Sequence, residues 1–296
     1  MRYFVVLVVG CVLCIGCRKP EPPMMRIYCC EVYQDVLREE AAVFASVYNM
    51  HVRLLPIFVP EPEEPSPTES TTELKRRSPA PWRTRPSDRR TLTSGRSVVD
   101  PRIKELIRAI SDRTVYGDLY LTDSPQQAEL LYEETAVSRE YPFCVLTLTL
   151  LVAKDNPLRI ESIQSLLDAE RRLGIIEPSL DGMGETAFRL ISKYRRVTAE
   201  GKPDERITLF DRQAKLLKAL ENGEVDAVLV WEPLTLITTE FAEVVELPEE
   251  ERQAVRQPLL ALSTADQPGY GKRFADFLIS PRGRAILKKY GFTASD

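Results

Sequence analysis

Residues 220–231 read LENGEVDAVLVW, and this stretch decides the fold. Its first residues end a helix that we predict over 215–221, whose leucines at 216, 217 and 220 face inward. Asn222-Gly223 supplies the stop signal of that helix. Residues 225–231 (VDAVLVW) are apolar and predict a buried strand. A helix that passes through a glycine turn into a buried strand is typical of α/β proteins.

The same alternation of strands and helices extends in both directions from this stretch. Predicted strands cover 25–30, 51–58, 117–122, 141–153, 174–176, 225–231 and 257–263. Predicted helices cover 32–50, a segment from Pro101, 162–167, 185–194, 215–221 and two segments of the tail, the last beginning at Ser280-Pro281 and ending at Gly291. The fold class is therefore α/β with open sheets, in which ligands sit beyond the carboxyl ends of strands, near helix N-termini.

One segment, residues 59–97, breaks this alternation. It is rich in proline, acidic in its first half and basic in its second half, and it has few apolar residues. Such a composition cannot bury enough surface to order itself. We expect a disordered insertion that loops out of the first lobe. A basic arm for an anionic partner is the alternative interpretation.

The first residues have the pattern of an export signal. Phe4 to Ile15 is an almost unbroken apolar run, too short for a stable membrane span but suited to a signal-peptide core. Gly16-Cys17 after this run resembles the bacterial lipobox, which implies a signal peptide over 1–16, lipidation of Cys17, and a tether over 17–25. An ordinary signal peptide or a short membrane anchor is the alternative.

Composition excludes several classes of function. The net charge of −4 leaves the chain as a whole without the basic character of a nucleic-acid-binding protein. There is one histidine, His51, and we find neither a nucleophile elbow, nor a phosphate loop with lysine, nor a cysteine–histidine cluster with metal spacing. We therefore expect no enzyme activity, no cofactor and no metal. Cys29, Cys30 and Cys144 form no disulfide framework and are interpreted as buried strand residues.

Four segments, in order along the chain, carry a resemblance to one family. They are GDLYLTD at 117–123, LVAKDNP at 151–157, LENGEVDAVLVW at 220–231 and the tail FLISPRGRAILKKYGF at 277–292. Each resembles a segment of the molybdate-binding proteins of ABC importers, within the wider class of type II periplasmic binding proteins. The tail and the 220–231 stretch point to the wider class more than to molybdate.

The resemblance implies two α/β lobes joined by two crossover strands near 143–149 and 257–263. Lobe 1 would comprise 26–148 plus 258–296, and lobe 2 would comprise 149–257. A ligand would be held in the cleft between the lobes, and the closed form would dock on a membrane permease.

The resemblance also implies a set of ligand-binding positions. The family's neutral donors for a tetrahedral oxyanion correspond here to Val32, Ser94, the backbone of Met183, the backbone of Gln213, and Trp231. Val32 lacks the expected hydroxyl, and the indole N–H of Trp231 stands where a tyrosine hydroxyl is expected. Glu31 and Glu232 lie directly beside two of these positions. The glycine turn 182–184 and residues 93–95 could equally be ordinary caps and turns.

The negative charges of Glu31 and Glu232 affect which ligand charge the site can accept. One unit charge about 5 Å from a dianion, at an effective dielectric near 20, repels it by about 7 kcal/mol. Micromolar binding is itself worth only about 8 kcal/mol. Glu31 and Glu232 therefore point away, pair with a cation such as Arg212, or mark a different ligand.

These observations together predict an extracytoplasmic solute-binding lipoprotein of an ABC importer. It would face the periplasm or the cell exterior, act as a monomer, bind molybdate or tungstate, deliver it to a membrane permease, and bind no nucleic acid. One alternative is the same fold with another solute, either a metal cation or a small organic molecule. The other is a membrane-tethered sensor or interaction protein without a transport role.

Overall fold

The computed structural model describes residues 22–57, 99–194 and 205–295. The predicted signal peptide, Cys17, most of the predicted tether, the predicted insertion and Ser94 lie outside these residues. Within them, no helix is both long enough and apolar enough to cross a membrane.

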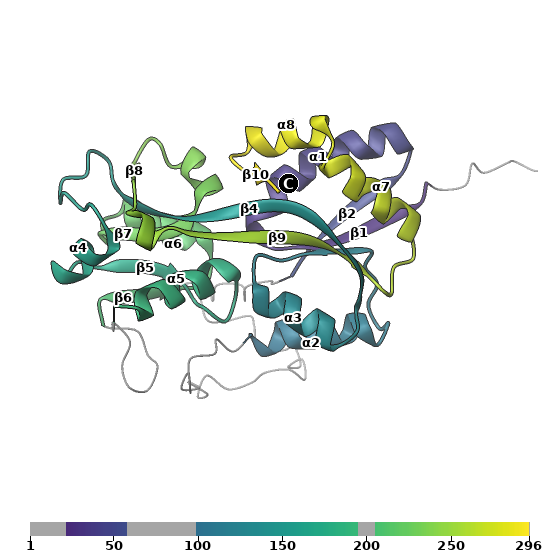
Figure 1. Cartoon of the computed structure of the whole chain (residues 1–296), viewed down its shortest axis with the longest axis horizontal. Helices are drawn as coiled ribbons and strands as arrows, with labels where there is room; N and C mark the ends of the chain where they lie inside the picture. The colour runs from purple at the N-terminus through teal and green to yellow at the C-terminus, as the bar shows by residue number, and fades with distance from the viewer. Residues whose placement is uncertain (1–21, 58–98, 195–204, 296) are drawn as a thin grey trace, which may run out of the picture.

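Two α/β lobes lie side by side, and two long strands pass from one to the other (Figure 1). The two long strands are β4 (Val137–Ala153) and β9 (Gln253–Leu262). Lobe 1 contains β1 (Met24–Cys29), α1 (Gln34–Tyr48), β2 (His51–Pro56), α2 (Pro101–Ser111), β3 (Leu119–Leu121), α3 (Pro125–Glu133), α7 (Pro268–Leu278), α8 (Pro281–Lys289) and β10 (Thr293–Ala294). Lobe 2 contains α4 (Ile163–Asp168), β5 (Leu173–Ile176), α5 (Gly182–Ser192), β6 (Ile207–Phe210), α6 (Gln213–Glu221), β7 (Ala227–Trp231) and β8 (Ala242–Val245).

One continuous hydrogen-bonded sheet runs through both lobes, in the order β2-β1-β3-β9-β4-β7-β5-β6. The outer strands are parallel to their neighbours, with β1 between β2 and β3 in lobe 1 and β5 between β6 and β7 in lobe 2. The central strands β4 and β9 are antiparallel and pair from Val137↔Leu262 to Leu148↔Gln253. The expected two-lobe architecture with two crossover strands is confirmed.

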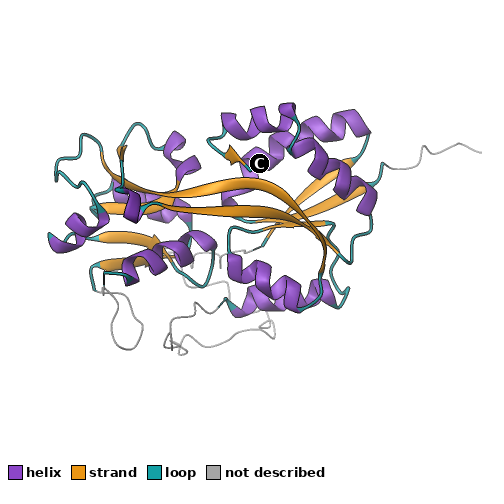
Figure 2. Cartoon of the chain, in the orientation of Figure 1, coloured by secondary structure: helices purple, strands orange, loops and turns teal. Residues whose placement is uncertain are grey.

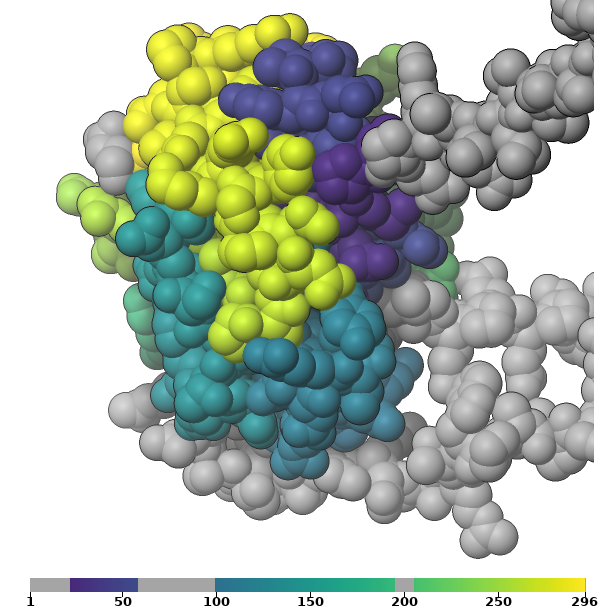
Figure 3. Space-filling model, turned by 90° about the vertical axis from the view of Figure 1, so that its right-hand side faces the viewer, coloured from purple at the N-terminus to yellow at the C-terminus, as the bar shows by residue number. Residues whose placement is uncertain are grey.

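Helices cover both faces of the sheet in lobe 1 (Figure 2). On one face α1 packs against α7 and α8, which lie side by side at the end of the lobe in Figure 3. Phe44 of α1 packs there edge-on against Phe274 and at a tilt against Phe277 of α7, at centroid distances of 5.1 and 5.7 Å. On the other face α2 buries Ile103 and Ile107 in a second apolar cluster with Tyr120, Leu131 and Leu260. β1 and β3 therefore lie between two apolar clusters, one on each face of the sheet.

Local signals explain most element ends. Ser280 caps α8 through a 3.3 Å hydrogen bond from Gly283 N to its hydroxyl, as predicted from Ser280-Pro281. The helix itself stops at Lys289, two residues before Gly291. The helix predicted over 32–50 begins instead as a 3₁₀ turn, η1 (Glu31–Tyr33), and ends at Tyr48 because Asn49 adopts a left-handed conformation, φ 48°.

Several boundaries differ from the sequence prediction. β1 begins at Met24 inside the segment predicted as tether, and β4 and β9 begin at Val137 and Gln253, each four residues early. Pairing between β4 and β9 keeps the polar residues at their starts extended, although these residue types alone do not predict a strand. α3, β6 and β8 were not predicted.

Candidate functional site

A pocket of about 380 Å³ lies between the lobes, at the carboxyl ends of strands from both. Lobe 1 contributes residues after β1, after β2 and on α3, and lobe 2 contributes residues at the starts of α5 and α6. They are Cys29, Cys30, Glu31, Gln34, Pro56, Ile57 and Gln127 from lobe 1, and Leu180, Asp181, Asp211, Arg212 and Ala214 from lobe 2. This volume is in the range of small-molecule sites.

Glu31 reaches the pocket from lobe 1, in the turn that follows β1. Burial raises the pKa of its carboxyl, while the backbone N–H of Gln213 and the guanidinium of Arg212 act in the opposite direction. Gln213 is the first residue of α6, so the Glu31 carboxylate lies against the positive end of a helix in the other lobe. Asp211 opposes this stabilisation by raising the same pKa.

Asp181 reaches the pocket from lobe 2, as the N-cap residue of α5. Its Oδ1 accepts a 2.8 Å hydrogen bond from Gly184 N. The pKa of this carboxyl is nevertheless well above its ordinary value, first because of burial and then because of the negative charges of Asp123 and Glu31. Among the described residues, no lysine, arginine or histidine forms a salt bridge with Asp181.

Asp123 lies directly behind the pocket, in the turn after β3, and links the lobes. Its Oδ1 accepts from Gly182 N at 3.1 Å, and its Oδ2 accepts from Trp231 Nε1 at 2.9 Å. Its backbone carbonyl accepts from Gln257 Nε2 of β9 at 3.1 Å. One residue of lobe 1 therefore contacts the start of α5 and the end of β7 through its side chain, and a crossover strand through its backbone carbonyl.

Further hydrogen bonds between the lobes surround this contact. Gln127 Nε2 donates to the carbonyl of Leu180 at 3.3 Å, and Ser124 Oγ donates to Glu185 Oε2 at 3.0 Å. Asp100 N donates to the carbonyl of Ser179 at 2.9 Å. The structure therefore shows the closed arrangement of the lobes.

The residues predicted to bind the ligand occupy different positions. Glu31 lines the pocket, and Gln213 is buried beside it. Met183 and Trp231 are fully buried one layer behind, where Met183 Sδ accepts from Trp231 N at 3.1 Å. Val32 is buried in the lobe 1 core. Glu232 is exposed at the start of the 3₁₀ helix η2 (Glu232–Ile237) and does not line the pocket.

Three residues at or behind the pocket that sequence reasoning missed, or mentioned only in passing, had local signals. Asp181 directly precedes the glycine turn and is an N-cap residue, and Arg212 stands at the N-cap of α6. Asp123 is the last residue of the segment GDLYLTD. Ile57 and Gln127 carried no signal, because only the meeting of β2, α3 and α5 brings them to the cleft.

The thiols at the pocket are protonated at neutral pH. Burial raises the pKa of Cys29 to about 12 and that of Cys30 well above its ordinary value, where Asp123 adds to the effect. A thiol in this state is a poor nucleophile and a poor metal ligand. In addition, no three His, Cys, Asp or Glu side chains of the described residues are arranged to hold a metal ion.

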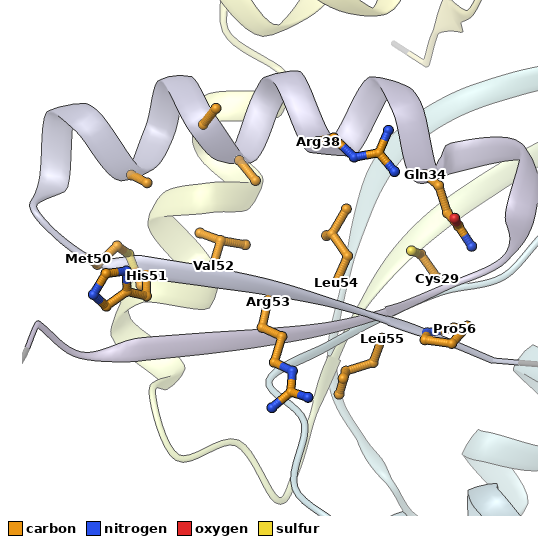
Figure 4. Close-up of a pocket in the computed structure, with 13 residues that line it drawn as sticks. Cys29, Gln34, Arg38, Met50, His51, Val52, Arg53, Leu54, Leu55 and Pro56 are labelled. Carbon is orange, nitrogen blue, oxygen red and sulfur yellow. The ribbon is translucent and has the colours of Figure 1, made fainter.

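A second cavity, about 590 Å³ in volume, lies between α1 and the edge strand β2 (Figure 4). Val52 and Leu54 point from β2 toward α1, and Arg38 and Gln34 extend over the space from the helix (Figure 4). Both walls belong to lobe 1, so movement of the lobes would not open or close this cavity. The pocket between the lobes is therefore the better candidate for a ligand site.

The sequence model of a family described as "Bacterial extracellular solute-binding protein" matches residues 82–293. No curated protein matches the chain at the level of sequence.

Solved structures show the same fold at low sequence identity. The periplasmic molybdate-binding protein of Azotobacter vinelandii is 12% identical, with a TM-score of 0.59 over 92% of this chain and 100% of that one. The sulfate-binding protein of Mycobacterium tuberculosis is 13% identical, with a TM-score of 0.64 over 93% and 88% of the two chains. A periplasmic thiamin-binding protein is 10% identical, with a TM-score of 0.64 over 93% and 84%.

Proposed function

The chain belongs to the family of bacterial extracellular solute-binding proteins, and from that premise we propose that the pocket between its lobes captures one small solute for an ABC importer. It has the type II fold of these proteins, and its family is not enzymatic. The expected absence of a catalytic role therefore agrees with the family assignment.

The observation that carries this proposal is that residues of both lobes line the pocket. Glu31 and Ile57 come from lobe 1, whereas Asp181 and Arg212 come from lobe 2. A solute that contacts both walls binds the closed arrangement better than an open one, and it therefore shifts the population toward closure. A closed form that signals occupancy is what a permease needs in order to distinguish loaded receptor from empty receptor.

Identification of the natural solute tests the proposal directly. The chain starting after Cys17, purified from the native host without denaturation, should carry a small molecule that native mass spectrometry detects. Addition of that molecule to stripped protein should raise the midpoint of thermal unfolding. If no compound co-purifies and none from a broad transport-substrate library shifts the midpoint, the protein is not a solute receptor.

The proposal includes a lipid anchor at Cys17 and the division into lobes at 148/149 and 257/258. The lipobox-like Gly16-Cys17 after an apolar run supports the anchor. Metabolic labelling with a radioactive fatty acid should mark the wild-type protein and leave Cys17→Ser unlabelled. Equal labelling of both would remove the anchor from the proposal and leave solute capture intact.

A tetrahedral oxyanion such as molybdate or tungstate is the solute class that the sequence resemblance favours. The N-termini of α5 and α6 at the cleft support it, since helix starts bind anions well. Glu31, Asp181 and Asp211 oppose it, because each carboxylate near a dianion costs several kcal/mol. A thermal shift measured with millimolar molybdate decides between these effects.

A further inference from the structure

We propose that the solute is a small organic cation whose protonated nitrogen binds between Glu31 of lobe 1 and Asp181 of lobe 2. This inference rests on the proposed function and names the chemical class of ligand for the same pocket. It follows from which groups line the pocket, which groups are already bonded within the protein, and what the remaining walls can contact.

Negative charge predominates in the pocket, and it comes from both lobes. Among the described residues, three carboxylates, those of Glu31, Asp181 and Asp211, line it together with one cation, Arg212. Arg212 lies 3.7 Å from Asp211, between its Nε and Oδ1, so part of its charge is already balanced. The carboxylate of Asp123 lies directly behind and adds to the negative field at Asp181. Such a field attracts cations and repels anions.

The helix donors that would hold an oxyanion are engaged by carboxylates of the protein. At the start of α5, Gly182 N donates to Asp123 and Gly184 N donates to Asp181. The backbone N–H of Met183 also stabilises the Asp181 carboxylate. At the start of α6, the backbone N–H of Gln213 stabilises the Glu31 carboxylate. An incoming oxyanion would have to displace these internal anions before it could bind.

The same pocket is poorly suited to a bare metal ion. The described residues contain no cluster of three ligating side chains, and the two thiols in the pocket are held protonated. Its volume of about 380 Å³ greatly exceeds that of a single ion. Ile57, Leu180 and Pro56 supply apolar walls that suit the carbon skeleton of an organic molecule.

Closure of the lobes brings the carboxylates of Glu31 and Asp181 to act on the same ligand. Glu31 and Asp181 belong to different lobes, so closure brings their negative charges together, and Glu31 raises the pKa of Asp181 in the closed structure. A cation between them removes this repulsion, and an ammonium group can donate hydrogen bonds to both. The ligand's charge therefore favours the closed arrangement that presents the loaded receptor to a permease.

The test is a thermal-shift screen of the chain starting after Cys17 with matched sets of cationic, anionic and neutral compounds. The cationic set consists of amines that are protonated at neutral pH, including putrescine and agmatine. The anionic set includes molybdate, tungstate and sulfate, and the neutral set consists of monosaccharides. Calorimetric titration then gives affinities for every compound that raises the unfolding midpoint. Three variants accompany the wild type: Glu31→Gln, Asp181→Asn and Glu232→Gln.

We expect binding within the cationic set only. Glu31→Gln and Asp181→Asn should each weaken that binding by about ten-fold to a hundred-fold, the range expected when a charged hydrogen-bond partner is neutralised. Asn remains a good N-cap residue, so Asp181→Asn should retain α5. Glu232→Gln removes an exposed carboxylate outside the pocket and should change affinity less than two-fold, a rough limit for surface charges.

Other results would overturn the inference. Binding of an anion or a neutral compound, with none by a cation, leaves the solute-receptor function standing and disproves the ligand class. Cation binding that Glu31→Gln and Asp181→Asn leave unchanged disproves the assigned residues. Absence of any binding in all three sets, together with no co-purified compound, contradicts both the ligand class and the receptor function.

Discussion

The indole N–H of Trp231, at the end of β7, donates a 2.9 Å hydrogen bond to the carboxylate of Asp123, in the turn after β3. Both side chains are almost fully buried, and the bond joins the two lobes. The other oxygen of Asp123 accepts from Gly182 N at 3.1 Å. A single carboxylate therefore serves two donors of lobe 2.

Replacement of Asp123 by Asn should loosen the closed arrangement. The amide has one acceptor oxygen and cannot serve both donors, which costs about 1–3 kcal/mol for the donor left unpaired. In a background where Trp82 is replaced by Phe, Trp231 is the sole tryptophan, and its emission should move to longer wavelength in Asp123→Asn. Unchanged emission and unchanged solute affinity would show that the bond does not hold the lobes together.

Replacement of Gly182 by Ala should prevent full closure. A β-carbon at this position would lie 1.7 Å from the carbonyl oxygen of Asp123, which is backbone and cannot turn aside. Small-angle scattering should give a larger radius of gyration for Gly182→Ala than for wild type, and solute affinity should fall at least about ten-fold. Gly269→Ala is the matched control, because nothing lies within 4 Å of its added carbon.

Glu40 should make stability depend on pH. This residue of α1 is fully buried, neither carboxyl oxygen has a hydrogen-bond partner among the described residues, and burial raises its pKa from 4.5 to about 8. Between these two pKa values the folded state therefore keeps a proton that the unfolded chain releases. The contribution of Glu40 to the free energy of unfolding should be highest below about pH 4.5 and should fall as the pH rises to about 8.

The variant Glu40→Gln should flatten this dependence, since the amide cannot ionise. At pH 9 we expect its free energy of unfolding to exceed that of wild type by about 2–4 kcal/mol, and at pH 5 the two should be similar. Denaturant titrations at both pH values measure the difference. Glu129→Gln, an exposed change on α3, should keep the wild-type slope; equal slopes for all three proteins would show that Glu40 does not titrate as inferred.

Asp118 should be a strong contributor to the stability of lobe 1. Its side chain accepts from Arg26 N at 2.8 Å and from Gln267 N at 2.7 Å, and thereby joins β1 to the start of α7. Asp118→Ala leaves two partly buried backbone donors unpaired and should cost about 2–4 kcal/mol of unfolding free energy in denaturant titrations. Asp266→Asn breaks only the half-exposed ion pair with Arg26 and should cost less than about 1 kcal/mol.

The sequence predicted the fold well where apolar runs and caps coincide. The strand 225–231 contains β7, and Ser280-Pro281 marks the first turn of α8. Prediction was weakest where the sheet imposes structure on ordinary residues. β6 and β8 are four-residue strands with exposed positions, and they are extended because a neighbouring strand pairs with them. α3 has only a weak apolar stripe, and Ser124-Pro125 was its overlooked start signal.

The binding site was predictable only in part, and for a physical reason. The family resemblance singles out Glu31, because this residue directly precedes Val32, a position implied to hold a ligand donor after the first strand. Asp181 and Arg212 stand at helix starts that the predictions placed two or three residues too late. Ile57 and Gln127 face the cleft only because distant segments meet there, and no local pattern encodes such a meeting.

The direction of β1 has a consequence for how the receptor would sit on a cell surface. Its six residues run from Met24 to Cys29, with Glu31 and the pocket at the carboxyl end. The described chain enters the domain at the opposite end of the strand, about 20 Å away at the usual rise per residue. A force on a tether attached at Cys17 would therefore act on the end of lobe 1 that lies away from the cleft. The solute would enter from the side of the molecule opposite the tether.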